Sequence, residues 1–254
     1  MRCRAWDDMD GIGNPVSSYY YPHQPEPKEV QTSDEFNSKK LGLQWQWVAN
    51  PKDNWYELKD GKLLLPAIYS ANDPLFETPH VLTQMFPDFS FTATAKMELS
   101  NSEKVRGGLT SFGRKTFDIG VEQLDKAFRI SVRFNNDILV SALTHERDNI
   151  WLRLKTNGEM PKLLERRESA SIETEVIQRE NLQPYEYEDL ERWKNGLITG
   201  QFSYSLDGEN FTDLGEPFEV RSGRWTGARI GLYSLKNEAE GNGHVAFDYI
   251  RIER

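Results

Sequence analysis

The sequence has almost no cysteine, since Cys3 is the single one among its 254 residues. Without an intrachain disulfide, a chain of this length must hold its fold together through a buried core. The chain also lacks any apolar run near the roughly 20 residues that a membrane-spanning helix needs. The basic residues after Met1 are not followed by an apolar stretch, unlike those of a secretory signal peptide. We therefore expect no membrane partner, and a cytoplasmic location unless the chain is truncated at its N-terminus.

Positive charge is scarce as well, because 31 Lys and Arg residues stand against 40 Asp and Glu residues, a net charge of −9. This balance disfavours nucleic acids and anionic membranes as partners, since both are polyanions. It does not count against a neutral sugar. The four histidines lack metal-ligand spacing, and neither a Gly-x-Ser-x-Gly elbow nor a phosphate loop is present. Among so many acidic residues, no pair stands out as the acid and base of a glycosidase.

Two parts of the chain differ in composition. Residues 1–32 hold Pro15, Pro22, Pro25 and Pro27, which remove backbone donors that a sheet needs, and this predicts an irregular connector. From residue 33 onward, short segments alternate apolar and polar side chains with the period of a half-buried strand. These segments are 43–48, 62–65, 89–99, 116–121, 128–134, 150–154, 201–205, 229–233 and 245–252. The pattern predicts one all-β domain over 33–254, a sandwich or a barrel.

One stretch interrupts the alternation. Residues 156–197 are strongly charged and mostly lack a period of two. A long segment of this kind inside a compact domain is usually functional or disordered. It is interpreted either as a solvated insertion or as a flap or partner surface, and the sequence leaves both open.

Aromatic side chains are the candidates for stacking on sugar rings, and the tryptophans considered are Trp45, Trp47, Trp55, Trp151, Trp193 and Trp225. Alternating aromatics in a strand are usually core residues, so Trp45 and Trp47 are predicted to face the interior. Trp225 differs, because it lies in the polar, glycine-bracketed segment Ser222–Gly227. A large aromatic there is as consistent with an external contact as with a core position.

Several short segments together resemble the C-terminal, concanavalin A-like domain of glycoside hydrolase family 43 β-xylosidases. In chain order they are Asp34-Glu35-Phe36, 41–47, Asn50-Pro51, Leu82-Thr83-Gln84, 91–94, 202–208 with Phe211, 223–228, Gly231-Leu232-Tyr233 and 246–249. The resemblance covers 33–155 and 198–254, and Gly11–Val16 looks like the family's link after the catalytic domain. It implies a two-sheet antiparallel β-sandwich of the concanavalin A-like jelly-roll type.

The resemblance also implies a role. In that family a catalytic β-propeller carries the acidic catalytic residues and precedes the sandwich, so no catalytic residue is assigned to this chain. The expected function is that of an accessory domain in a β-xylosidase or α-L-arabinofuranosidase acting on xylan-derived oligosaccharides. The sandwich would pack on the propeller and close its substrate pocket. Whether the chain has any activity of its own stays open.

Specific residues follow from the same resemblance. A loop of the family's sandwich brings an aromatic residue, usually Phe, to the rim of the substrate pocket. Trp225 holds this position here, with Arg224 and Thr226 beside it, and the bulkier Trp would change the depth of the pocket. No cofactor is required, although related sandwiches imply a structural calcium ion held by Glu35 and Asp248.

Two other functions compete with this interpretation. A free-standing carbohydrate-binding module would show an exposed aromatic platform and bind xylan without a partner. A sandwich that is itself a hydrolase would contain an unrecognised carboxylate pair. The sequence leaves a homo-oligomer open.

Overall fold

The computed structural model describes residues 6–7, 14–15, 30–70, 75–100, 105–124, 127–145, 149–159, 198–223, 226–236 and 242–254. The chain separates into two units, Met1–Val30 and Gln31–Arg254. In the first unit, the described strands are the antiparallel pair β1 (Trp6–Asp7) and β2 (Asn14–Pro15). In the described part of the chain, no helix is long and apolar enough to cross a membrane.

The second unit consists of two sheets. The first, called the β9 sheet, has the order β12 (Asp137–Thr144), β11 (Phe128–Phe134), β10 (Phe117–Gln123), β9 (Val105–Phe112), β17 (Arg229–Lys236), β7 (Leu82–Met85) and β3 (Gln46–Trp47). Neighbours along this order are antiparallel. Strand β6 (Ile68–Tyr69) joins it as a parallel neighbour of β17.

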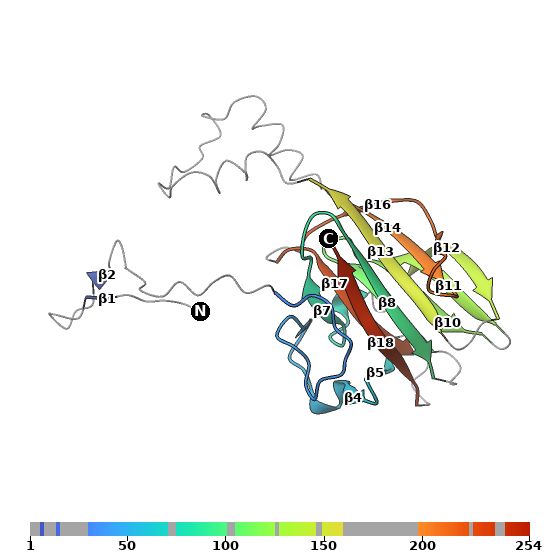
Figure 1. Cartoon of the computed structure of the whole chain (residues 1–254), viewed down its shortest axis with the longest axis horizontal. Coiled ribbons are helices and arrows are strands. Elements are labelled where there is room, and N and C mark those ends of the chain that lie inside the picture. Colours follow the sequence, from blue (N-terminus) through green and yellow to red (C-terminus); the bar gives the residue numbers. More distant parts are fainter. Residues whose placement is uncertain are drawn as a thin grey trace, which may run out of the picture. The chain divides into compact units, whose positions relative to one another are not determined.

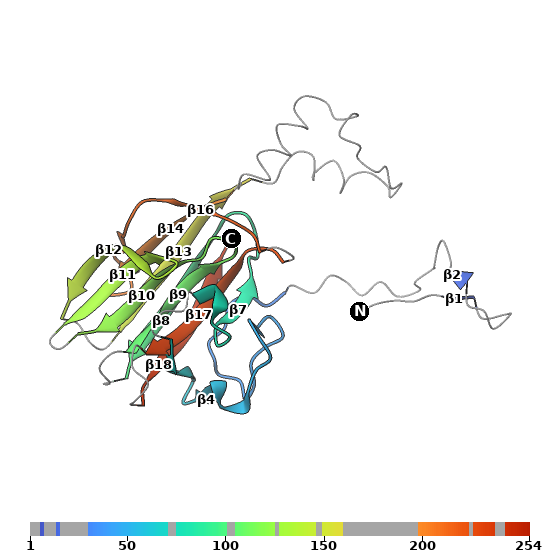
Figure 2. The same ribbon diagram turned by 180° about the vertical axis from the view of Figure 1, so that it is seen from behind.

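The second, called the β8 sheet, has the order β15 (Thr212–Asp213), β14 (Ile198–Ser205), β13 (Ile150–Gly158), β8 (Phe91–Leu99), β18 (His244–Glu253), β5 (Lys62–Pro66) and β4 (Glu57–Lys59). Its pairs are antiparallel, and β16 (Phe218–Val220) is added along β14. Figures 1 and 2 show the two sheets stacked as layers. The prediction of a two-sheet antiparallel β-sandwich is confirmed.

The hydrophobic core lies between the two sheets. Every second residue of β8 from Phe91 to Met97 is buried there, as the alternating sequence predicts. The facing strands contribute Leu109, Ile119 and Ile130. The sheets approach so closely at Gly107 that a Cβ atom on it would lie 2.3 Å from a methyl group of Val245 in the opposite sheet.

The central strands of the β9 sheet are buried on their outer face too, and this was not predicted. Strand β9 is buried at every position except its last, so it has no alternation. The short 3₁₀ helix η2 (Leu75–Glu77) and Val81 cover this outer face, where Leu75 and Val81 pack with Tyr233 and Leu235 in a second, smaller cluster. Side chains that point away from the main core are therefore still inside the protein.

The hairpin between β4 and β5 forms as its sequence predicts. Asp60 and Gly61 have φ angles of 52° and 72°, so both central residues of the turn are left-handed. This conformation belongs to the two-residue turn whose twist matches antiparallel strands, and Gly adopts it without strain.

The strand predicted at 43–48 is wrong in most of its length. Gly42 and Trp45 form a turn, in which the Trp45 amide donates to the Gly42 carbonyl, and Leu43 is fully exposed at its tip. Only Gln46 and Trp47 join a sheet, as β3. Trp45 is nonetheless buried and Trp47 packs against the core, so the prediction that both face the interior is confirmed.

Candidate functional site

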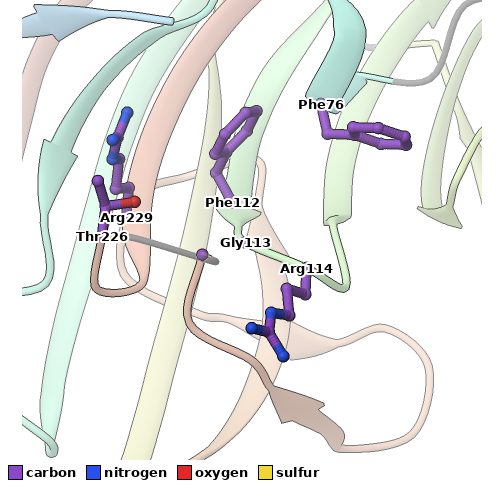
Figure 3. A pocket seen from close by; sticks show the side chains of 7 residues that line it. Phe76, Phe112, Gly113, Arg114, Thr226 and Arg229 are labelled. Atoms are coloured by element: carbon purple, nitrogen blue, oxygen red, sulfur yellow. The ribbon is translucent and has the colours of Figure 1, made fainter.

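The described chain has a hollow of about 450 Å³ on the outer face of the β9 sheet. It is lined by Phe76, Phe112, Gly113, Arg114, Gly223, Thr226 and Arg229. Figure 3 shows Arg229 and Thr226 on one side of Phe112, and Phe76 and Arg114 on the other. The lining combines two phenyl rings, two guanidinium groups and one hydroxyl, a mixture typical of sites that bind a small polar molecule with an apolar face.

Neighbouring strands position the centre of the hollow. Phe112 is the last residue of β9 and Arg229 the first of β17, and the two are direct partners across the antiparallel ladder. Directly paired residues place their side chains on the same face of a sheet. Phe76 comes from η2, the element that covers this face.

The floor of the hollow is a close contact between two loops. A Cβ atom on Gly113 would lie 1.8 Å from the carbonyl oxygen of Arg221, so only glycine fits there. The Arg114 amide donates a 3.4 Å hydrogen bond to the Ser222 carbonyl, which ties the turn after β9 to the loop before β17. The two Arg side chains of the lining therefore start from backbone that is fixed by its neighbours.

The predicted pocket loop lies at this hollow. Gly223 and Thr226 both line it, and Thr226 is exposed. The predicted residues Arg224 and Trp225 lie outside the described residues, as does Trp193. Of the lining residues, Thr226 was predicted from the sequence. The side chains of Phe76, Phe112, Arg114 and Arg229 were not, because they come from segments that are far apart in the chain and share no motif.

A buried charged network lies on the same outer face. The Tyr233 hydroxyl donates a 2.5 Å hydrogen bond to Asp118 Oδ2, and Arg106 Nη1 is 3.7 Å from the same oxygen. All three residues are almost fully buried. Burial raises the pKa of the Asp118 carboxyl, against the lowering effects of Arg106 and of the Tyr233 hydrogen bond. Burial also raises the pKa of the Tyr233 hydroxyl well above its usual range, so this hydroxyl stays protonated and acts as a donor.

A second carboxylate extends this network toward β11. Glu122 Oε2 lies 2.6 Å from Arg129 Nη2 and 3.1 Å from Arg133 Nη2. Charges at such depth are tolerated only when they are paired, and a lost partner leaves a costly isolated charge. The carboxylates and guanidinium groups of this network pair with one another, so we assign it a structural role in the β9 sheet.

Aromatic residues on the outer face of the β8 sheet are covered by cations. The Lys96 ammonium lies 5.7 Å from the ring centre of Trp151, and the Arg251 guanidinium 3.8 Å from that of Tyr249. Trp151 Nε1 donates a 2.9 Å hydrogen bond to the Tyr249 hydroxyl. Trp45 and Trp55 are buried in the interior. These rings do not form the bare platform that a free-standing carbohydrate-binding module needs.

The two predicted calcium ligands each have a cationic partner. Glu35 forms a 2.8 Å ion pair with Arg251, and Asp248 forms a 2.7 Å ion pair with Lys96. The hydrogen bond to Glu35 raises the pKa of the Arg251 guanidinium, and the charge of Asp248 adds to this effect. Calcium takes six to eight oxygen ligands, whereas no group of three or more His, Cys, Asp or Glu side chains converges among the described residues. This donor set does not fit calcium, and the prediction itself stays untested.

Comparison with known families gives a match over most of the chain. The family model described as the β-xylosidase C-terminal concanavalin A-like domain matches residues 33–182 and 192–253. The match continues through most of the charged stretch 156–197, which was predicted to lie outside the resemblance.

Among curated proteins, a β-xylosidase of Formosa agariphila is 28% identical over 250 residues, which cover 96% of this chain and 38% of that protein. A protein of Xylanibacter ruminicola, named as a candidate β-xylosidase, is 24% identical and matches 92% of this chain and 36% of its own length. This chain thus spans less than two fifths of either relative.

Solved structures share the fold. The bifunctional GH43-CE protein of Bacteroides eggerthii superimposes with a TM-score of 0.63 at 23% identity, over 87% of this chain and 25% of that one. The GH43 BlXynB protein of Bacillus licheniformis gives a TM-score of 0.64 at 17% identity, over 98% of this chain and 45% of that one. In both, the matched sandwich is part of a longer chain.

Proposed function

This chain belongs to the family of β-xylosidase C-terminal concanavalin A-like domains, and we therefore propose that it is the accessory domain of a family 43 glycoside hydrolase. The enzyme would be of the β-xylosidase or α-L-arabinofuranosidase type and act on xylan-derived oligosaccharides. The chemistry would take place in a catalytic β-propeller, and the sandwich would pack against that propeller and close its substrate pocket.

The observation that carries the proposal is the hollow beside the loop that the family uses at its pocket. Gly223 and Thr226, on either side of Arg224 and Trp225, both line it. We propose that Trp225 supplies the aromatic face at the rim of the propeller's pocket, flanked by Arg224 and Thr226. A closing aromatic of this kind excludes water and limits the site to the end of a short chain.

A chimeric enzyme tests the proposal directly. The segment of the Formosa agariphila β-xylosidase that matches this chain is replaced by residues 1–254, and hydrolysis of 4-nitrophenyl xyloside is measured. We expect the chimera to hydrolyse the substrate, the same enzyme without any sandwich to lose most activity, and the isolated chain to have none. An inactive but folded chimera, or hydrolysis by the isolated chain, would refute the proposal.

Substitutions at the loop test the role of the tryptophan. In the chimera, Trp225→Ala should lower kcat/KM about 10-fold or more, the cost of losing one buried aromatic face. The matched control is Trp225→Phe, which restores the family's usual aromatic and should retain most activity. Equal activity of the two variants would show that the aromatic face does not contribute.

A further inference from the structure

The hollow on the β9 sheet has an unusual charge for this protein. The chain has a net charge of −9, yet the seven residues that line the hollow include two arginines and no acidic residue. The carboxylate of Glu219, in β16, is already shared by Lys115 at 2.8 Å and Arg221 at 2.6 Å. The positive charge of the lining is therefore not neutralised by that carboxylate.

One of the two arginines has a buried donor without a partner. Arg229 Nε is buried and makes no hydrogen bond to any described residue. A buried donor left unpaired costs free energy, because it has given up its hydrogen bonds to water. Arg229 also lines the hollow, so a ligand oxygen there that drew the guanidinium outward would supply the missing acceptor. A carboxylate is the best match, because it accepts two parallel hydrogen bonds from one guanidinium.

The rest of the lining selects a ring-shaped ligand. Phe112 lies directly across the ladder from Arg229, and Phe76 comes from the helix that covers the sheet. Phenyl rings of this kind pack against the apolar face of a pyranose, while the Thr226 hydroxyl can hydrogen-bond to a sugar hydroxyl. Figure 3 shows Phe112 between Arg229 and Arg114, with Phe76 beyond it on the side away from Arg229. The cavity, about 450 Å³ in volume, is in the range of small-ligand sites.

From this arrangement we infer that the hollow binds a carboxylate-bearing sugar, a uronic acid carried as a side group on the oligosaccharide. Arg229 binds the carboxylate, Arg114 adds positive charge at the opposite side, and the two phenyl rings contact the ring. The sugar part of the inference rests on the proposed function, whereas the preference for an acid rests on the arginines alone. The accessory domain would then select oligosaccharides that carry a uronic acid side group, in addition to closing the substrate pocket.

Titration calorimetry of the 254-residue chain tests the inference with three probes: xylotriose bearing one glucuronic acid, unsubstituted xylotriose, and free D-glucuronate. We expect the acidic oligosaccharide to bind at least about 10-fold more tightly than the neutral one, the effect of one charge-assisted hydrogen bond. Free glucuronate should bind weakly, because it lacks the chain. Equal affinities for the acidic and neutral oligosaccharides, or binding of neither, would overturn the inference.

Two variants locate the binding site. Arg229→Met and Arg114→Met should each weaken binding of the acidic probe, the former about 10-fold or more. Arg114 is exposed, so its replacement leaves the fold intact even where Arg229→Met lowers stability. The matched control is Arg251→Met on the β8 sheet, which should bind the acidic probe as tightly as the wild-type protein does. Unchanged affinity in both hollow variants would place the site elsewhere.

Nuclear magnetic resonance gives an independent measurement without substitutions. The acidic probe should shift the amide signals of Gly113, Gly223 and Thr226, and xylotriose should not. Shifts confined to the β8 sheet would contradict the assignment of the site. The outcome is separable from that of the chimera, because the chimera reports hydrolysis of an uncharged aryl xyloside, which needs no arginine in the hollow.

Discussion

The hydrogen bond between Tyr233 and Asp118 offers a sharp test of how the β9 sheet is stabilised. Tyr233→Phe removes one hydroxyl from a side chain that is fully buried. The ring stays the same size, so the packing around Leu75, Val81 and Leu235 is kept. The change deletes the 2.5 Å hydrogen bond to Asp118 Oδ2 and leaves Arg106, 3.7 Å away, as the remaining partner of that oxygen.

The magnitude follows from the burial of the acceptor. A hydrogen bond contributes about 0.5–1.5 kcal/mol, and a buried acceptor that loses its donor adds a desolvation cost of about 1–3 kcal/mol. Because Arg106 compensates part of that cost, we expect the free energy of unfolding to fall by about 2–3 kcal/mol. In a domain of this size each kcal/mol corresponds to about 2–4 °C in Tm.

Urea denaturation followed by tryptophan fluorescence measures this change. The midpoint should fall while the slope with denaturant stays the same, since the surface exposed on unfolding is unchanged. The matched control is Tyr56→Phe, because the half-buried Tyr56 hydroxyl has no hydrogen bond among the described residues and should change stability little. Equal effects of the two substitutions, or a loss below about 1 kcal/mol at Tyr233, would refute the reasoning.

Three further predictions concern other parts of the sandwich. Gly108→Ala should destabilise the domain by about 3 kcal/mol, because the new Cβ would lie 2.1 Å from the Ile119 carbonyl oxygen in a packed backbone. The control Gly42→Ala meets only the flexible side chain of Gln44 and should cost under about 0.5 kcal/mol. Thermal unfolding measures the loss of stability in both variants. Burial lowers the pKa of His80, and the charge of Lys52 lowers it further, so the neutral imidazole contributes stability above about pH 6.5 that is lost as the pH falls below that value. His80→Phe should flatten the dependence of Tm on pH in this range, and an unchanged slope would contradict the assignment. Because both predicted calcium ligands are held in ion pairs, EDTA should leave Tm unchanged, and a lowered Tm that calcium restores would show that a metal site exists after all.

Strands with one buried and one solvent-exposed face could be predicted from the sequence. Strand β8 alternates buried and half-buried side chains along its length, and its prediction at 89–99 is confirmed as Phe91–Leu99. Strand β9 could not be found in this way, because both of its faces are buried and Gly107-Gly108 resembles a turn. Strand β12 was missed because Ile138, Leu139 and Val140 are three consecutive apolar residues, so its sequence does not alternate even though much of the strand is exposed.

The hollow was only partly predictable. Thr226 could be named because it belongs to a continuous segment that resembles the family's pocket loop. Phe76, Phe112 and Arg229 meet only after η2 folds over the β9–β17 pair, and their separation in sequence leaves no spacing to recognise. The unpaired Nε donor of Arg229 could not be predicted either, because an arginine at the start of a strand is normally solvated and only the fold buries this atom.

The cations that cover the aromatic rings of the β8 sheet have a consequence for how new binding surfaces arise. Lys96, Arg153 and Arg251 each lie over an aromatic ring, at 5.7, 3.3 and 3.8 Å from the ring centres of Trp151, Phe211 and Tyr249. Three replacements by small polar residues would bare all three rings without altering the core. A handful of mutations thus separates this closed surface from one that could hold a polysaccharide on its own, and engineers can make the same substitutions deliberately.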